Sequence, residues 1–253
     1  MMAETQNAPE PKKSDLGTRA ASAVVMVAVA GTALWLGGWW WTVFVAAVAL
    51  GVLWEWVQLA SKLSNNRLAY LCWIVGGLIY VGLAALFLVS QRTRADSVDF
   101  VLAIVGAVVA VDIGAYFAGR TFGGPKIAPA ISPSKTWAGL AGGIIAATFV
   151  IFWTIMASGF CYYDGPPVWF PCLPFGWVGW AEFLISSAIL GAGVAIVAQA
   201  GDFFESWMKR KAGVKDSGDL IPGHGGLFDR TDGLLAVCFV IGLLWLPAHF
   251  MSS

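Results

Sequence analysis

Seven long apolar runs constrain this 253-residue chain more than any other feature of its sequence. A helix needs about 20 apolar residues to cross the hydrocarbon core of a bilayer. The runs cover residues 20–36, 42–60, 69–89, 98–118, 138–158, 181–200 and 233–251. Only 12% of the residues are charged, against about 25% in soluble domains. The sequence therefore predicts an all-α, polytopic membrane helix bundle with about seven transmembrane helices, a count that leaves eight or nine open.

The first 18 residues differ from the rest of the chain because they are polar and contain Pro, Lys and Asp. We expect residues 1–18 to form a disordered tail and residues 19–253 to form a single transmembrane domain. The first apolar run has one feature of a signal peptide, the small-x-small triplet Ala28-Val29-Ala30. That triplet lies inside the run rather than after it, so we expect an uncleaved first span.

Lys and Arg are divided unequally between the two sides of the predicted bundle. With seven spans, the segments on one side of the membrane are 1–19, 61–68, 119–137 and 201–232. All Lys and Arg residues lie in these segments except Arg92 and Arg94. Cytoplasmic segments carry the excess of positive charge. We therefore place the N-terminus in the cytoplasm and, for a bacterial protein, the bundle in the inner (plasma) membrane.

Residues 201–232 form a charged stretch between the last two apolar runs. The stretch holds 11 of the 30 Asp, Glu, Lys and Arg residues, six acidic and five basic. Carboxylates bind divalent metals, and Lys and Arg bind phosphate. This mixture favours phosphoryl or nucleotidyl transfer at the cytoplasmic face. The formal net charge of zero argues against a nucleic-acid partner.

The start of the charged stretch has helical spacing. Asp202, Glu205, Ser206, Lys209 and Arg210 are three and four residues apart, which places them along one helical face. For Glu205 we favour a solvated helix end, with Lys209 as its i,i+4 partner. Asp202 instead follows a nearly uncharged span, where a carboxylate needs a cation, and we expect a metal there.

The end of the charged stretch combines a loop with a helix start. Gly225 and Gly226 allow backbone N–H groups to approach an anion closely. Asp229 and Asp232 then open the last apolar run, three residues apart. Two alternatives stay open: Asp232 as an N-terminal cap, and His224 as a loop histidine without a role in chemistry.

A second polar segment, residues 112–137, lies on the same predicted side as the charged stretch. Asp112 and Tyr116 are i,i+4 neighbours at the end of the fourth apolar run. Hydroxyl and cationic groups follow at Arg120, Lys126, Ser132, Ser134, Lys135 and Thr136. The alternative for the basic residues is that they only anchor the chain on the cytoplasmic side.

Glu55 stands between Trp54 and Trp56, near the cytoplasmic end of the second apolar run. A carboxylate at that depth is expected to reach toward the interface or to pair with a basic residue. The sequence alone assigns it no catalytic role.

The charged stretch has a recognisable pattern. It reads Ser206-x-x-Lys209-Arg210-x4-Lys215-Asp216-x-Gly218-x-Leu220, then His224-Gly225-Gly226-x-x-Asp229-Arg230-x-Asp232. Upstream, further positions fit the same pattern: Asp112, Gly114, Tyr116, Gly119, Arg120, Gly123, Lys126, Ser132, Pro133, Lys135 and Thr136. Residues 109–251, which contain both segments, resemble the phosphatidate cytidylyltransferase (CDP-diacylglycerol synthase) family. One position departs from the family pattern, because Ala138 stands where the family usually has Glu.

The resemblance implies a reaction in which CTP and phosphatidic acid give CDP-diacylglycerol and pyrophosphate in the membrane. It also implies a Mg²⁺ ion held by Asp202 and Asp229, leaves open a second, monovalent cation, and implies a homodimer. The catalytic residues would be Lys135, Asp202, Asp229, Lys209 and Arg210. The substrate-binding residues would be Asp112, Tyr116, Arg120, Lys126, Ser132, Thr136, Ser206, Lys215, Asp216, His224, Gly225, Gly226, Arg230 and Asp232.

Two other functions compete with this hypothesis. A transporter would place charges near mid-span or show inverted repeats, whereas here the charges gather at one face and no repeat is visible. A CTP-dependent lipid kinase of the polyprenol or dolichol type would use similar groups but release CDP instead of pyrophosphate.

Cys161 and Cys172 lie in the predicted outward-facing loop between the fifth and sixth apolar runs. An oxidising periplasm would permit a disulfide between them; the alternative is two free or interfacial thiols. Counting thiols by mass spectrometry decides between these outcomes. Four alkylatable thiols in unreduced, denatured protein would exclude the bridge.

Overall fold

The computed structural model describes residues 16–251 with gaps at 65, 95–97, 158–179 and 222–224. Three sequence-based predictions therefore lie wholly or mostly outside the described residues: the disordered tail at residues 1–18, the pairing of Cys161 with Cys172, and the role of His224.

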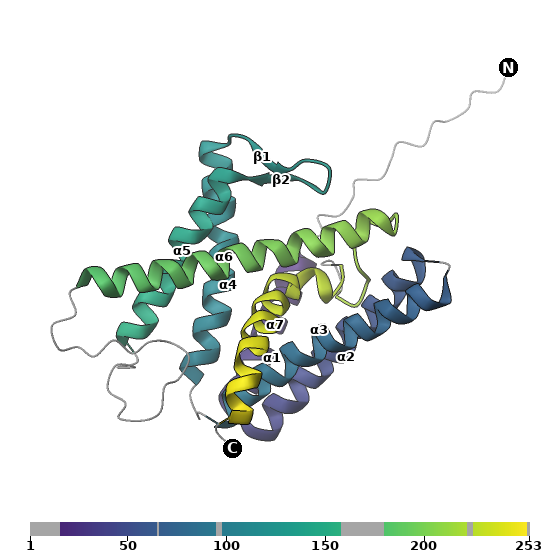
Figure 1. Cartoon of the computed structure of the whole chain (residues 1–253), viewed down its shortest axis with the longest axis horizontal. Coiled ribbons are helices and arrows are strands. Elements are labelled where there is room, and N and C mark those ends of the chain that lie inside the picture. The colour runs from purple at the N-terminus through teal and green to yellow at the C-terminus, as the bar shows by residue number, and fades with distance from the viewer. Residues whose placement is uncertain (1–15, 65, 95–97, 158–179, 222–224, 252–253) are drawn as a thin grey trace.

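The described residues form seven helices and one short hairpin (Figure 1). The helices are α1 (Leu16–Leu36), α2 (Gly38–Leu63), α3 (Arg67–Arg94), α4 (Val98–Phe122), α5 (Trp137–Ala157), α6 (Trp180–Lys211) and α7 (Phe228–Met251). Each predicted apolar run coincides with one of them. Five helices, α2 to α6, are long and apolar enough to cross a membrane. The helical membrane bundle is thus confirmed, while the count of seven spans stays a prediction.

Small residues let the helices approach one another closely. In α4, Gly114 lies so near α5 that a Cβ atom there would stand 2.5 Å from the Gly142 carbonyl oxygen. In α6, a Cβ atom on Gly201 would stand 2.6 Å from the Asp232 carbonyl oxygen in α7. Close backbone packing through small residues is typical of membrane helices. The contact at Gly201 brings the charged end of α6 against the start of α7.

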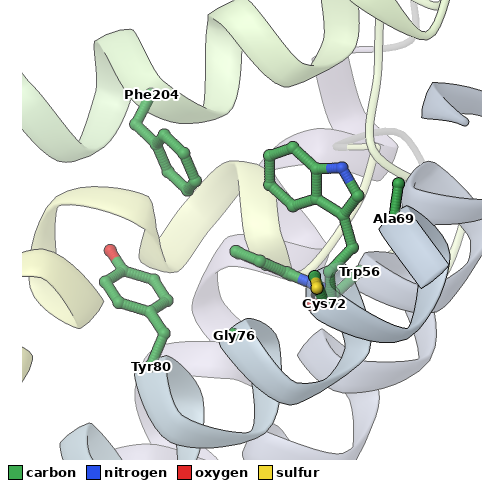
Figure 2. Close-up of a pocket in the computed structure, with 7 residues that line it drawn as sticks. Trp56, Ala69, Cys72, Gly76, Tyr80 and Phe204 are labelled. Carbon is green, nitrogen blue, oxygen red and sulfur yellow. Dashed lines mark hydrogen bonds between the residues drawn. The ribbon is translucent and has the colours of Figure 1, made fainter.

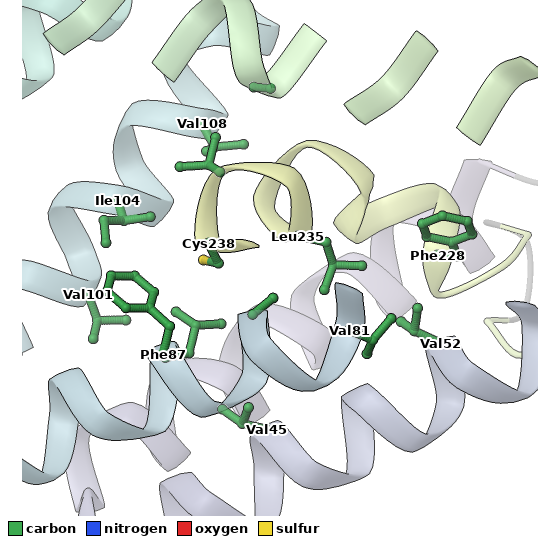
Figure 3. Close-up of a cluster of buried hydrophobic side chains, with 14 of the residues drawn as sticks. Val45, Val52, Val81, Phe87, Val101, Ile104, Val108, Phe228, Leu235 and Cys238 are labelled. Carbon is green, nitrogen blue, oxygen red and sulfur yellow. The ribbon is translucent and has the colours of Figure 1, made fainter. Parts of the chain in front are cut away.

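The buried apolar core lies between α2, α3, α4 and α7 (Figure 3). Val52 of α2, Val81 of α3 and Phe228 of α7 have at most 1% of their surface exposed and lie at one end of this core. Other large apolar side chains, including Trp39 and Leu50, face outward. An apolar exterior of this kind fits a protein surrounded by lipid.

A two-stranded antiparallel hairpin connects α4 to α5, and the all-α expectation did not include it. Its strands are β1 (Lys126–Ala128) and β2 (Ser132–Thr136). Gly123 and Gly124 precede β1 with φ angles of 63° and 93°, a conformation that glycine adopts readily. The buried Thr136 hydroxyl accepts a hydrogen bond from the Gly139 amide at 3.0 Å, which caps α5. This cap fixes where β2 ends and α5 begins.

Candidate functional site

Three carboxylates converge where α6 packs against α7. Asp202 and Glu205 of α6 and Asp232 of α7 each offer an oxygen atom, and these atoms lie within 4.8 Å of one another. We call these three residues the carboxylate cluster. The close approach of the helices at Gly201 makes this arrangement possible.

Two residues of the cluster differ from the sequence-based expectation. Glu205 is only 1% exposed, so the prediction of a solvated helix end was wrong for this residue; the tight packing of α6 on the core buries it. Asp232 lies one turn inside α7, which begins at Phe228, so the N-cap alternative was also wrong.

Lys135 on β2 brings the second polar segment to the cluster, because its ammonium group forms an ion pair with Asp202. Burial by itself would lower the pKa of Lys135, but the nearby carboxylates of Asp202, Asp112 and Asp232 raise it above its usual value. Lys135 is therefore charged at neutral pH. The two polar segments of the sequence, 112–137 and 201–232, meet at this contact.

Lys209 is the second partly buried cation of the site. Its Nζ lies 2.8 Å from Glu205 Oε2 and 2.5 Å from Asp229 Oδ1. The predicted i,i+4 pair with Glu205 is confirmed, although it is buried rather than solvated. Because one ammonium group contacts two carboxylates, Lys209 joins the carboxylate cluster to Asp229.

Asp229 is held mainly by donors of the protein itself. Its Oδ2 accepts hydrogen bonds from the Ser217 and Gly226 amides, both at 2.9 Å. Burial alone would raise the pKa of Asp229, but the hydrogen bonds from Lys209 and from these amides hold it below the usual range. Asp229 is thus ionised, and the Gly226 amide that we expected to face an anion is engaged by it. Asp229 is not part of the group of closely approaching carboxylates, so its role as a metal ligand stays a prediction.

The site contains more carboxyl groups than cationic groups. Five carboxylates surround two ammonium groups: Asp112, Asp202, Glu205, Asp229 and Asp232 around Lys135 and Lys209. Burial, with repulsion from Asp202 and Asp112, raises the pKa of Asp232 to about 7. One oxygen of Glu205, Oε1, is buried without a hydrogen-bond partner among the described residues. Several carboxyl oxygens close together fit a hard divalent cation.

Most of the remaining predicted residues lie outside the carboxylate cluster. The exposed Tyr116 hydroxyl accepts a hydrogen bond from Arg120 at 2.8 Å. Ser206 donates to Asp202 at 3.3 Å, Ser132 begins β2, and Thr136 caps α5. Gly225 forms a bridge with Ile221 and has a φ of 84°. Exposed side chains are also found at Asp112, Arg120, Lys126, Arg210, Lys215, Asp216 and Arg230.

Sequence reasoning missed the part that Glu55 plays. Its side chain is 1% exposed and accepts hydrogen bonds from Ser217, Leu227 and Phe228. The expectation that it reaches the interface or pairs with a basic residue was therefore wrong. Its position between two Trp residues within an apolar run was the one hint that the sequence offered.

Removing the charge of Lys209 is expected to destabilise the protein. Lys209→Met keeps an unbranched side chain that is one atom shorter, but leaves the buried Glu205 carboxylate without its cation. Breaking a buried ion pair costs about 3 kcal/mol, so the melting temperature in detergent should fall clearly below that of the wild type. Lys211→Met is the matched control, because Lys211 is exposed and lies over the Trp207 ring at 5.1 Å. Equal melting temperatures for the two variants would contradict this account.

Comparisons with known proteins match most of this chain to one family. The sequence profile of the Cytidylyltransferase family matches residues 17–77 and 64–246. The phosphatidate cytidylyltransferase of Brucella suis is 32% identical, over 91% of this chain and 93% of that protein. That of Rickettsia bellii is also 32% identical, over 94% of this chain and 96% of that protein. That of Haemophilus influenzae is 40% identical over a shorter alignment, 51% of this chain and 39% of that protein.

Proposed function

The chain belongs to the Cytidylyltransferase family, and from that membership we propose that it is a phosphatidate cytidylyltransferase. It converts CTP and phosphatidic acid into CDP-diacylglycerol and pyrophosphate, a step of phospholipid biosynthesis. The observation that carries the proposal is the carboxylate cluster of Asp202, Glu205 and Asp232, flanked by the partly buried cations Lys135 and Lys209.

The reaction depends on positioning of the two substrates and on stabilisation of phosphate charge more than on a strong base. An oxygen of the phosphatidate phosphate attacks the α-phosphorus of CTP, and the bond from that phosphorus to the departing pyrophosphate breaks. Negative charge spreads over the phosphate oxygens in the transition state, and fixed cations stabilise it. Lys135 and Lys209 are fixed by their ion pairs and are suited to this task. Arg210, exposed at the end of α6, can meet the triphosphate from the solvent side.

The carboxylate cluster is our candidate for the site of Mg²⁺. Asp202, Glu205 and Asp232 would hold the ion, which when bound supplies neutralisation of the phosphate charge. The pair Asp202 and Asp229, which the family resemblance implies, is the competing ligand set. A second, monovalent cation is compatible with the excess of carboxylates at this site.

An apolar cavity lined by residues of α2, α3 and α6 supports a lipid substrate (Figure 2). Its volume is about 690 Å³, and its lining includes Trp56, Cys72, Tyr80 and Phe204. Phe204 of this lining lies on α6, between Asp202 and Glu205 in the sequence. We propose that acyl chains of the lipid use this route, with the phosphate turned toward Lys135.

Membrane placement and assembly follow as further parts of the proposal. We propose an inner-membrane protein of bacterial type with a cytoplasmic N-terminus and a homodimeric assembly. The contact between Lys135 and Asp202 supports this orientation, because it requires segments 119–137 and 201–232 to share one face. The positive-inside rule assigns that face to the cytoplasm.

Two labelled forms of CTP test the proposed reaction in purified protein. With [α-³²P]CTP and phosphatidic acid, the label should enter the lipid product, and with [γ-³²P]CTP it should leave as pyrophosphate. A CTP-dependent lipid kinase gives the opposite result, because the γ-phosphate enters the lipid. A panel of phosphatidic acid, polyprenol and dolichol identifies the acceptor. Absence of labelled lipid with every acceptor would overturn the assignment as an enzyme and favour a transporter.

A further inference from the structure

Glu55 on α2 is a buried acid that the proposed chemistry does not use. Its Oε1 accepts a hydrogen bond from the Leu227 amide, and its Oε2 accepts one from the Phe228 amide, both at 2.8 Å. The Ser217 hydroxyl also donates to Oε2, at 2.8 Å. A charged acceptor with three short hydrogen bonds is a strong attachment point. These bonds connect α2 to residues more than 160 positions further along the chain.

The Leu227 and Phe228 amides lie where α7 begins, within the charged stretch. Amides at the start of a helix have no partner within the helix, and a carboxylate there complements the helix dipole. A residue close in sequence usually supplies this group. Here Glu55 supplies it from another helix, so the start of α7 is fixed relative to α2.

Ser217 links Glu55 to Asp229. Its hydroxyl lies 2.8 Å from Glu55 Oε2 and 3.0 Å from Asp229 Oδ2, and a hydroxyl has a single proton to donate. The Ser217 amide donates to the same Asp229 oxygen at 2.9 Å. A shift of Ser217 would therefore disturb Asp229, and with it Lys209, whose Nζ lies 2.5 Å from Asp229 Oδ1.

Two glycines of the charged stretch make room for the Glu55 carboxylate. A Cβ atom on Gly218 would stand 2.7 Å from Glu55 Oε1 and 2.9 Å from its Cγ and Cδ atoms. A Cβ atom on Gly226 would stand 2.6 Å from Glu55 Oε2 and would collide with the Ser217 hydroxyl. The nearest atoms to a Gly218 side chain would thus all belong to Glu55.

Apolar packing also holds α2 against the start of α7. The rings of Trp56 and Phe228 lie 5.6 Å apart, and Figure 3 shows Phe228 at the same end of the core as Val52. The Trp56 indole N–H donates to the Trp73 carbonyl at 2.9 Å, which fixes the ring. These contacts hold the backbone around Glu55 in place, so that its carboxylate can fix the position of Ser217, Leu227 and Phe228.

We propose that Glu55 is a positioning residue for the transfer reaction, holding Ser217, Leu227 and Phe228 so that Asp229 and Lys209 stand correctly beside the carboxylate cluster. The inference rests on the proposed cytidylyltransferase function. It extends the site to α2, outside the segments that carry the sequence pattern. Glu55 acts through Ser217 and Asp229 and touches neither substrate.

Glu55→Gln tests this role with little change in volume. The amide nitrogen of Gln would face a backbone N–H or the Ser217 hydroxyl, so at least one of the three hydrogen bonds is lost. Loss of a group that orients a ligand-bearing residue typically costs about 10–100-fold in activity. We expect kcat to fall by that factor while KM for phosphatidic acid stays within about threefold. The assay is run well below the melting temperature, and the exposed Asp99→Asn serves as control.

Hydrogen exchange measured by mass spectrometry provides a readout that does not depend on activity. In Glu55→Gln, peptides that contain the Leu227 and Phe228 amides should exchange faster than in the wild type, and peptides from α4 and α5 should not change. Unchanged exchange in residues 225–233 would overturn the proposal, because Glu55 would then not hold these amides. An unchanged kcat with only the yield lowered would also overturn it, in favour of a purely structural role.

A double-mutant cycle identifies Glu55 as the partner of Gly218. Gly218→Ala should displace the carboxylate and lower kcat about as much as Glu55→Ala does. In the Glu55→Ala background the same change should have little further effect, because its collision partner is gone. Additive losses would contradict the proposal. Gly82→Ala in α3 is the control, since nothing lies within 4 Å of a Cβ atom there.

These results separate the inference from the proposed function. If wild-type protein forms no CDP-diacylglycerol in the labelled-CTP assay, the proposed reaction fails whatever Glu55 does. If the wild type is active but Glu55→Gln matches it in kcat and in exchange, only the role of Glu55 fails.

Discussion

Asp202→Asn should lower kcat by about 10³-fold, which is the typical effect of removing a group that stabilises charge in the transition state. Asn keeps the shape of the side chain but removes its charge from the carboxylate cluster and from the ion pair with Lys135. The protein should still insert and purify, because Asp202 is partly exposed and is not part of the apolar core. The assay uses [α-³²P]CTP at saturating Mg²⁺, with Asp99→Asn as control. Near-normal turnover would remove Asp202 from the site.

Metal binding can be followed separately from turnover. Mn²⁺ replaces Mg²⁺ at many oxygen sites, and electron paramagnetic resonance counts the bound ion in purified protein. Asp202→Asn and Asp232→Asn should each weaken Mn²⁺ binding at least about tenfold, the lower end of what loss of even a supporting group costs in metal affinity. Asp229→Asn should weaken it less, because protein donors already engage Asp229. An equal loss in Asp229→Asn would favour the ligand pair Asp202 and Asp229.

Lys135→Ala should lower kcat by about 10²-fold with little loss of yield. Its ammonium group is fixed against Asp202 and close to Asp112 and Asp232. Without it, the phosphate groups of both substrates would face the carboxylates with one cation fewer. Negative charge in the transition state would then be less stabilised. Expression should be retained because β2 lies outside the buried core.

The control for this variant is Lys62→Ala, an exposed lysine at the end of α2 that lies on the same predicted side of the membrane. If Lys135→Ala lowered only the yield, as a residue that merely anchors the chain would, specific activity would match that of Lys62→Ala. That result would return Lys135 to the positive-inside interpretation.

The helices of this protein follow directly from its sequence. Within lipid the backbone must satisfy its hydrogen bonds inside each segment, so an apolar run of sufficient length is helical almost regardless of its neighbours. Each of the seven runs accordingly corresponds to a helix. Local spacing also predicted the contact of Glu205 with Lys209, because residues four apart on a helix are neighbours.

The same local reasoning could not predict which side chains are buried together. The sequence indicated Asp202 as a metal ligand, but the proximity of Glu205 and Asp232 depends on how closely α6 and α7 pack at Gly201. The position of Lys135 depends on a hairpin that the apolar pattern does not predict. Glu205 looked solvated because its neighbours in sequence are polar, yet tertiary packing leaves it 1% exposed.

Sequence alone thus determined the membrane class, the helices and the segments that carry the chemistry, since each depends on residues close together in the chain. Tertiary structure alone decided the composition of the site. Glu55 shows the physical reason most clearly: its partners lie 162 to 173 positions away, and no periodicity relates residues so far apart. Only the packing of α2 against α7 brings its carboxylate to the amides that it binds.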